Sequence, residues 1–308
     1  MSPIHFGMWL TCCRWPITRL THLFGGVTIA LSCLGGVSSA GTIAYRSMVL
    51  GDNPIVYYEF DEVGGTTLVN SASTGTLYNG AFNTSLGTLT VNQPSFSDGG
   101  TSYQFNGGFV TATAITNSLT EWTVEAWVNY DASKSSASNF LSNDQPDWNN
   151  DVLIGIGPEE GTQVPAGNFG VVQQGRGAST GRDFAGAPLA AGAWRHVAVI
   201  GSATAGTLSV FIDGVLAASD TALINGVTFN GADGFGTATL VVGASRPDGL
   251  RPYRGLLDEV AIYDYVLTPA QLTAHATITP IPEPSTYFLA LAGLACGVYS
   301  LFGRRKRG

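Results

Sequence analysis

Two acidic residues that lie far apart in the chain could hold one metal ion. Asp61 ends the first predicted β-strand, and Asp258 lies in the last. In a sandwich whose first and last strands meet, the two carboxylates would be neighbours, and calcium prefers hard oxygen ligands of this kind. The pair therefore predicts a structural calcium site. The alternative is that Asp258 and Glu259 end a strand and pair with a basic neighbour, for instance Arg254.

A second group of polar side chains occupies one predicted loop. Asp147, Asn149 and Asn150 surround Trp148 there. Carboxylates and amides at close spacing can bind calcium or the hydroxyl groups of a sugar, and an aromatic ring can stack on a sugar face. The spacing does not fit an EF-hand. Because loops on a rigid sheet carry recognition, this segment is the predicted ligand site, and a solvated acidic loop is the alternative.

Glu59 and Asp61 would share one face of a strand, as the paired carboxylates of some glycosidases do, roughly 5 Å apart in retaining enzymes. Glycosidases that use such a strand need a further acid three residues after the aspartate, where this chain has Gly64. His196 and His275 lack metal-ligand spacing and are predicted to be structural. The sequence therefore predicts no catalytic residues.

The composition restricts the class of partner. Of the 308 residues, 44% are apolar and 12% are charged, which is too apolar for a disordered chain. Residues 41–280 contain eight basic and 21 acidic residues, a formal charge of −13. Such a body argues against nucleic acid, which requires a basic face, and suits divalent cations. The four cysteines all lie in the apolar end segments, so no disulfide scaffold or thiolate site is expected between them.

Short apolar runs separated by Gly, Asn, Asp and Ser dominate the middle of the chain. In residues 122–130, Trp122, Val124, Ala126 and Val128 alternate with residues that face the other way, which is typical of a strand. About a dozen such runs without βα repeats predict an all-β fold, a two-sheet antiparallel jelly-roll sandwich. The other main runs are 55–61, 102–106, 109–113, 152–156, 168–173, 195–200, 208–212, 215–218, 240–243 and 256–263.

Three local signals predict turns and a helix. Asp-Gly at 213–214 predicts a β-hairpin, and Gly-Gly at 107–108 predicts another. Thr268, Pro269 and Gln271 together offer an N-cap, a proline at the first helical position and a capping box. One short C-terminal helix is therefore expected after the strands.

The N-terminal segment 1–40 has the features of a signal peptide. Arg14 and Arg19 form a positive flank, an apolar run covers residues 23–37, and small residues precede Gly41. Cleavage by signal peptidase would then leave a folded domain of residues 41–279. An uncleaved membrane anchor is the alternative, although the run is short for a span.

The C-terminal segment 280–308 has three parts in order. Pro282, Glu283 and Pro284 precede an uncharged apolar stretch at 287–302, which a basic end follows. The apolar stretch predicts a transmembrane helix with the body facing outward. This arrangement resembles the bacterial PEP-CTERM sorting signal. The resemblance implies recognition by an exosortase in the inner membrane, cleavage, and release to the surface or matrix; an ordinary tail anchor is the alternative.

The body itself resembles the laminin G-like, concanavalin A-like jelly-roll family. The resemblance implies two curved antiparallel sheets, often a structural calcium ion, and binding of glycans or proteins; some members are appended to enzymes. The pieces that carry it are Tyr-Glu-Phe-Asp-Glu at 58–62, Tyr-Gln-Phe-Asn-Gly at 103–107, Trp-Thr-Val-Glu-Ala-Trp-Val at 122–128, Trp-Arg-His-Val-Ala-Val at 194–199, Val-Phe-Ile-Asp-Gly at 210–214, Gly-Leu-Leu-Asp-Glu-Val-Ala-Ile-Tyr at 255–263 and Leu-Thr-Pro-Ala-Gln-Leu at 267–272.

These observations predict an exported surface or extracellular-matrix protein whose body is a non-catalytic carbohydrate- or protein-binding module. The expected partners are signal peptidase and an exosortase during export, the inner membrane transiently, and a glycan or surface protein. Calcium is the expected cofactor. The alternatives are a passive structural component of the matrix and a glycan-active enzyme, which the missing third acid at Gly64 disfavours.

Overall fold

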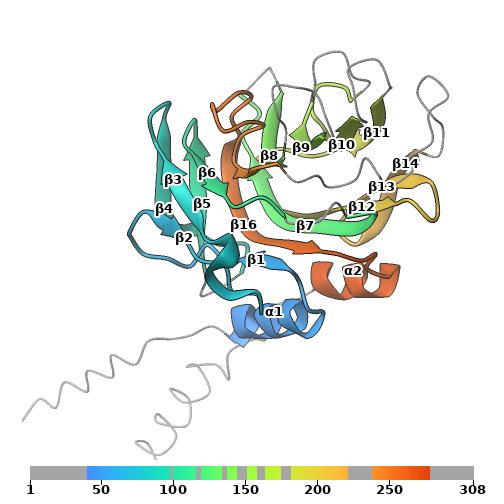
Figure 1. Ribbon diagram of the computed structural model, residues 1–308, viewed down its shortest axis with the longest axis horizontal. Coiled ribbons are helices and arrows are strands. Elements are labelled where there is room, and N and C mark those ends of the chain that lie inside the picture. Colours follow the sequence, from blue (N-terminus) through green and yellow to red (C-terminus); the bar gives the residue numbers. More distant parts are fainter. Residues whose placement is uncertain are drawn as a thin grey trace, which may run out of the picture. The chain divides into compact units, whose positions relative to one another are not determined.

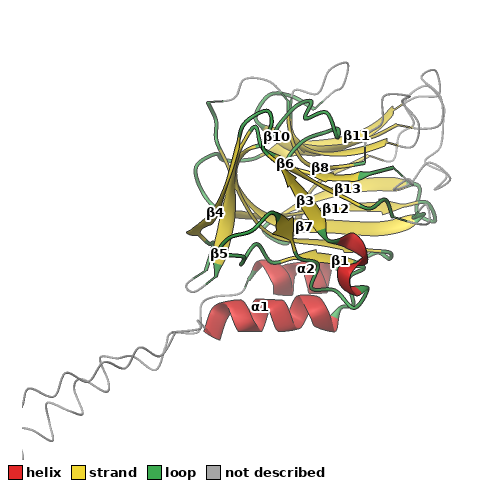
Figure 2. Cartoon of the chain, turned by 60° about the vertical axis from the view of Figure 1, so that its left-hand side comes forward, coloured by secondary structure: helices red, strands yellow, loops and turns green. Residues whose placement is uncertain are grey.

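The computed structural model describes residues 40–97, 100–115, 119–133, 137–143, 151–157, 164–174, 182–220 and 238–277. In these ranges two antiparallel sheets stack face to face (Figures 1 and 2), which confirms the predicted all-β sandwich. Residues 1–39 of the predicted signal peptide, the sorting signal, the predicted transmembrane helix and the loop that contains Asp147 to Asn150 lie outside these ranges. None of the helices within them has both the length and the hydropathy that a membrane span requires.

The first sheet, here called sheet A, has the strand order β14–β13–β12–β7–β16–β5–β4, and β1 pairs with β16. Strand β16 comes late in the chain but lies in the middle of sheet A, where it pairs with β1, β5 and β7. Its strands are β1 (Val56–Tyr58), β4 (Thr88–Pro94), β5 (Thr101–Asn106), β7 (Glu121–Tyr130), β12 (Arg195–Ser202), β13 (Thr207–Ile212), β14 (Val215–Asp220) and β16 (Arg254–Tyr263).

The second sheet, sheet B, has the order β11–β10–β9–β8–β15–β6–β3–β2. Its edge strand β11 also contacts β14, so the two sheets meet along one side. Its strands are β2 (Thr67–Leu68), β3 (Gly80–Asn83), β6 (Phe109–Ala112), β8 (Ser138–Ser142), β9 (Asp151–Ile156), β10 (Asn168–Gln174), β11 (Arg182–Pro188) and β15 (Leu240–Val242). A short 3-10 helix, η1 (Gly75–Tyr78), precedes β3.

Strand β7 follows the alternation that its sequence predicts. Trp122, Val124, Ala126 and Val128 belong to the core between the two sheets. The intervening side chains lie on the outer face of sheet A, where Trp127 belongs to a separate apolar cluster. The same strand therefore supplies both the main core and a second, smaller one.

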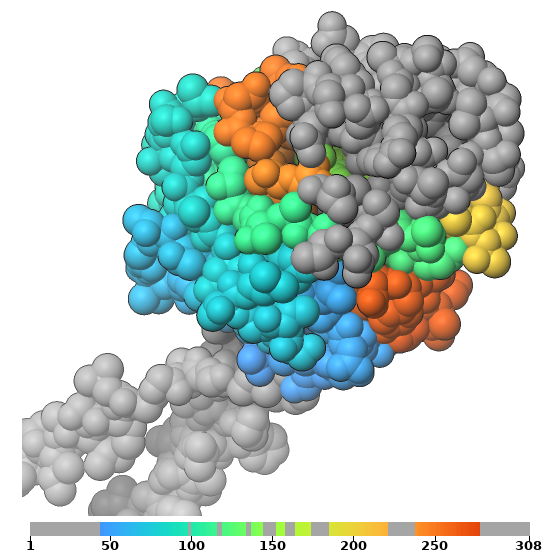
Figure 3. Space-filling model, in the orientation of Figure 1, coloured from blue at the N-terminus to red at the C-terminus, as the bar shows by residue number. Residues whose placement is uncertain are grey.

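Two helices cover part of this outer face. Helix α2 (Pro269–Ala276) begins with the predicted capping box, because the Thr268 hydroxyl accepts a hydrogen bond from the Gln271 amide and the Gln271 side chain accepts one from the Thr268 amide. Helix α1 (Ala40–Gly51) is not evident in the sequence pattern, and packing explains it: Tyr45 and Val49 are fully buried in the cluster that contains Trp127. Figure 3 shows α1 in blue beside α2 in orange.

The hairpin predicted at residues 213–214 is present, and the prediction of a hairpin at residues 107–108 is wrong. Strands β13 and β14 pair across Asp213 and Gly214, which have φ angles of 50° and 75°, as a two-residue turn of this kind requires. The Gly-Gly dipeptide 107–108 does not close a hairpin, because β5 lies in sheet A and β6 in sheet B. A Cβ atom on Gly108 would lie 2.8 Å from the Thr88 carbonyl, so this dipeptide serves a close crossing between the sheets.

Candidate functional site

The acidic residues predicted to hold calcium lie near each other. Strand β1 pairs with β16 as far as Tyr58 opposite Val260, and the chain beyond β1 carries Asp61 toward Asp258. Asp61 Oδ1 accepts a hydrogen bond of 2.7 Å from the Thr101 amide, and Asp258 Oδ2 accepts one of 2.6 Å from the Ser95 hydroxyl. The negative charge of Asp61 acts on the Asp258 carboxyl, as expected for neighbouring groups.

A β-bulge in β16 buries two adjacent carboxyl groups. The register with β7 shifts between Asp258 and Ala261, and Glu259 has a φ of 53°, a rare conformation for a residue with a side chain. Asp258 and Glu259 are each only 1% exposed. Within the described residues Asp258 forms no ion pair, its Oδ1 accepts no hydrogen bond, and Glu259 accepts one from the Tyr57 hydroxyl. The alternative pairing of Asp258 with Arg254 is therefore absent from the described structure.

Burial is the main cause of the raised pKa values of Asp258 and Glu259. It raises the pKa of Asp258 well above its ordinary value, and the charge of Asp61 raises it further. The pKa of Glu259 is raised in the same way, first by burial and then by the charge of Asp258. No group of three His, Cys, Asp or Glu side chains suited to a metal occurs in the described ranges. A calcium ion here would thus draw further oxygens from the backbone and water.

The carboxylate pair that a glycosidase would need does not share a strand. Strand β1 ends at Tyr58, and Phe60 has a φ of 58°, so the strand alternation stops before Asp61. Glu59 instead accepts a hydrogen bond of 2.8 Å from Arg46 Nε of helix α1. The structure thus gives both acids partners of their own.

A buried charge network lies between sheet A and the two helices. Glu125 on β7 is fully buried, and its carboxylate lies 3.2 Å from His196 Nε2 and 2.9 Å from His275 Nδ1. The Tyr263 hydroxyl donates a third hydrogen bond of 2.6 Å to Glu125. His275 Nε2 lies 3.1 Å from Asp52, so both ring nitrogens of His275 face carboxylates and donate to them. The histidines are thus structural partners of Glu125, as their sequence positions predict.

The pKa values of this network follow from its contacts. Burial opposes the charge on Glu125, but the hydrogen bonds and charges of His196 and His275 lower its pKa to about 2. Burial likewise opposes the charge on His275, but Glu125 and Asp52 together raise the pKa of His275 above 6.5. The network therefore favours the charged form of both residues.

This network predicts a defined pH dependence of stability. A raised pKa on His275 stabilises fully below pH 6.5 and loses its contribution as pH rises through the folded-state value. A lowered pKa on Glu125 stabilises above pH 4.5 and loses its contribution as pH falls toward 2. Urea unfolding from pH 3 to 9 should therefore show the largest difference between wild type and His275→Gln between pH 4.5 and 6.5. A difference that stays flat would contradict this assignment.

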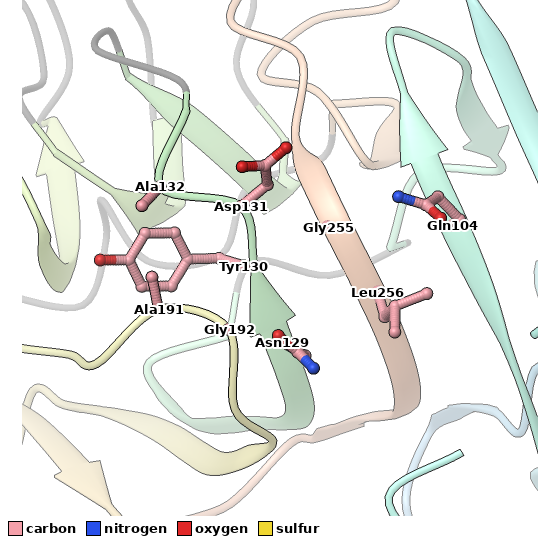
Figure 4. Close-up of a pocket in the computed structure, with 9 residues that line it drawn as sticks. All are labelled: Gln104, Asn129, Tyr130, Asp131, Ala132, Ala191, Gly192, Gly255 and Leu256. Atoms are coloured by element: carbon pink, nitrogen blue, oxygen red, sulfur yellow. The ribbon is translucent and has the colours of Figure 1, made fainter. Parts of the chain in front are cut away.

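A cavity of about 470 Å³ opens on the outer face of sheet A, away from the helices. Figure 4 shows Gln104, Leu256 and Asn129 side by side on three neighbouring strands. Its wall is the loop of Ala191 and Gly192, whose amide donates to the Tyr130 carbonyl at 3.1 Å, and Asp131 stands at its rim.

The backbone around the cavity is held tightly. The Tyr130 hydroxyl donates to the Leu189 carbonyl at 3.0 Å, and the Asp131 amide donates to the Arg254 carbonyl at 3.0 Å. Gly255 has a φ of 141°, and a Cβ atom there would lie 2.4 Å from the Asn129 carbonyl, so only glycine permits this close approach of β16 and β7. The cavity is therefore a preformed feature of the sheet.

Sequence reasoning missed both the cavity and the central role of Glu125. Glu125 meets His196 across a separation of 71 residues and His275 across 150 residues. The one available signal was that Glu125 shares its predicted strand face with Trp127, a large apolar side chain. The cavity residues come from β5, β7, β16 and two loops that are distant in sequence, so no local pattern in the chain groups them as one site.

Known proteins resemble this chain in fold. The chain is 26% identical over 159 residues to sushi, von Willebrand factor type A, EGF and pentraxin domain-containing protein 1 of Rattus norvegicus, which is 50% of this chain and only 4% of that protein. Domain 4 of AbnA, a GH43 extracellular arabinanase from Geobacillus stearothermophilus, was solved in complex with arabinotriose. It matches with a TM-score of 0.51 at 22% identity, over 73% of this chain and 98% of that one.

The binding domain of botulinum neurotoxin DC, solved in complex with rat synaptotagmin II, also has a TM-score of 0.51, at 12% identity over 73% of this chain and 51% of that one. At these identities the likeness shows the fold alone. Residues 98–273 match the family described as the concanavalin A-like lectin/glucanases superfamily, and residues 280–307 match the PEP-CTERM protein-sorting motif. The chain therefore belongs to the concanavalin A-like lectin/glucanases superfamily and carries a PEP-CTERM sorting motif, which indicates export to the cell surface through an exosortase.

Proposed function

We propose that the protein is a non-catalytic module that binds carbohydrate at the cell surface or in the extracellular matrix. The observation that carries the proposal is the preformed cavity on sheet A, whose side chains include two amides and a carboxylate. Such groups bind hydroxyl groups through hydrogen bonds. Among the described residues that line the cavity, Asp131 is the single carboxylic acid, whereas glycosidases use a pair of acids.

The neighbours support a binding role. The AbnA domain was solved with arabinotriose bound, and the neurotoxin domain was solved with a protein, synaptotagmin II. Carbohydrate is the better supported ligand class here, because the open cavity presents amide and carboxylate groups beside apolar side chains, which suits the hydroxyl and C–H groups of a sugar. A surface protein as ligand and a passive structural role are the alternatives. The loop residues Asp147, Trp148, Asn149 and Asn150 stay in the proposal as a second contact region for the ligand.

A structural calcium ion between Asp61 and Asp258 is also part of the proposal. The unpaired, buried Oδ1 of Asp258 and the neighbouring carboxylate of Asp61 fit a hard cation. The ion would offset the charges of buried carboxylates and link the first and last strands of sheet A. Export through the inner membrane, with removal of the signal peptide by signal peptidase and of the tail by an exosortase, completes the proposal.

A glycan array probed with the full-length protein in detergent, with calcium and with EDTA, tests the function. We expect binding to at least one class of oligosaccharide and no release of reducing ends from the same sugars. Binding to none of them would favour the passive structural role. Turnover would show instead that the protein is an enzyme.

A further inference from the structure

The outer face of sheet A carries a row of side chains that runs across three strands. Leu256 on β16 is directly opposite Gln104 on β5 and Asn129 on β7. Figure 4 shows the three side chains on the same face, with Leu256 in the middle. Gln104 is exposed, and Leu256 and Asn129 are half-buried. The row therefore presents an apolar centre between two amides.

These amides are available to a ligand. In the described part of the chain, neither the Gln104 nor the Asn129 side chain has a hydrogen-bond partner. An amide group offers both donors and acceptors, which matches a sugar hydroxyl, itself a donor and an acceptor. Leu256 offers an apolar surface for the C–H groups of a sugar ring.

The charges beside the row balance each other. Arg254 pairs with Asn106 in the next row of the sheet, and its carbonyl accepts the hydrogen bond of the Asp131 amide. Asp131 and Arg254 are both exposed, and the guanidinium acts on the Asp131 carboxyl. One negative and one positive side chain leave this surface without net charge. It therefore suits a neutral ligand better than an acidic one.

The size of the site points to more than one sugar ring. Neighbouring strands lie about 4.8 Å apart, so the amides on β5 and β7 are about 10 Å apart across β16. A ligand that contacts both must extend across the strands. The cavity of about 470 Å³ is in the range of about 300–1,000 Å³ that is usual for small-ligand sites.

We infer that Gln104, Leu256 and Asn129 form a binding site for a neutral oligosaccharide chain, which lies across strands β5, β16 and β7. This inference rests on the proposed function and names its site and ligand class. The Asp131 and Arg254 side chains contact the sugar hydroxyl groups at the edge of the site. The protein recognises uncharged sugars and excludes chains rich in uronic or sialic acid.

The test compares full-length wild type with the double variant Gln104→Ala and Asn129→Ala. The probes are arabino-, manno- and gluco-oligosaccharides of three or more units, with uronic-acid and sialylated oligosaccharides as the acidic set. We expect wild type to bind at least one neutral sugar, and the double variant to bind it about tenfold more weakly or worse, because two hydrogen bonds are lost. The matched control is Ser209→Ala with Ser219→Ala, which changes two side chains on the same sheet, one half-buried and one exposed; its affinity should stay that of wild type.

Three outcomes overturn the inference, and they differ in what they say about the proposed function. If wild type binds a neutral sugar and the double variant binds it equally well, another surface holds the ligand and the proposed function stands. If only acidic sugars bind, the ligand class is wrong. If wild type binds no sugar in either set, both the inference and the carbohydrate-binding function fail. Unchanged melting temperatures for both double variants will show that loss of binding is not loss of fold.

Discussion

Replacing Glu125 with alanine should lower the free energy of unfolding by about 3–5 kcal/mol, the usual cost of breaking a buried ion pair. The carboxylate receives hydrogen bonds from His196, His275 and Tyr263, and all of its surroundings are buried. The variant would leave His275 buried in an apolar cluster with only Asp52 as its carboxylate partner. Urea unfolding of the full-length protein at pH 6 measures the loss.

The matched control for this prediction is Glu121→Ala, which removes a glutamate from the same strand. Glu121 lies at the partly exposed start of β7 and accepts a hydrogen bond of 2.7 Å from the Thr204 amide. Its loss should cost about 1 kcal/mol. Hydrogen exchange should also be faster throughout α2 in the Glu125 variant and unchanged in the control. Equal costs for the two substitutions would show that the buried network adds no stability.

Calcium should raise the melting temperature of the wild-type protein by about 5–10 °C over its value in EDTA. An ion present at a hundred times its dissociation constant stabilises by about 2.7 kcal/mol, and 1 kcal/mol corresponds to about 2–4 °C for a domain of this size. The source of the effect is the Asp61 and Asp258 pair, because burial and mutual repulsion oppose the charged form of Asp258 in the absence of a cation. Thermal melts in 2 mM calcium and in EDTA, conditions chosen to be about saturating and metal-free, provide the measurement.

The Asp258→Asn variant separates an ion site from a simple buried acid. We expect it to lose the calcium response and, in EDTA, to be at least as stable as wild type, since a neutral amide is less costly to bury than a carboxylate. Asp264→Asn is the control, because Asp264 is an exposed acid just beyond the end of β16; it should keep the full response. Identical melting temperatures of the wild-type protein with and without calcium would contradict the proposed ion site.

The elements predicted well from sequence are those that local rules determine. The alternation of apolar residues predicts strand β7, and the Asp-Gly dipeptide predicts the β13–β14 turn. The capping box at Thr268 predicts the start of α2. The Gly-Gly dipeptide 107–108 misled because glycine permits both a tight turn and a close crossing between sheets, and only the global strand order decides between them. Helix α1 depends on the burial of Tyr45 and Val49 by distant residues, which overrides a weak local pattern.

The candidate sites show the same division. The proximity of Asp61 and Asp258 was predictable, because it follows from the pairing of the first and last strands. The burial of both Asp258 and Glu259 was not, because it depends on a β-bulge that sets the two residues out of strand alternation. The row formed by Gln104, Leu256 and Asn129 depends on the register of three strands that are distant in sequence.

The position of His275 has a consequence for the order of events during export. His196 follows Glu125 by 71 residues, but the second histidine partner, His275, follows it by 150 residues, on helix α2. Until helix α2 is in place, the Glu125 carboxylate lacks the hydrogen bond from His275, and this part of the outer face of sheet A stays open to water. A product cut short before α2 would carry an uncovered charge in its outer cluster, which makes it a ready target for proteases, whereas the finished chain closes over it.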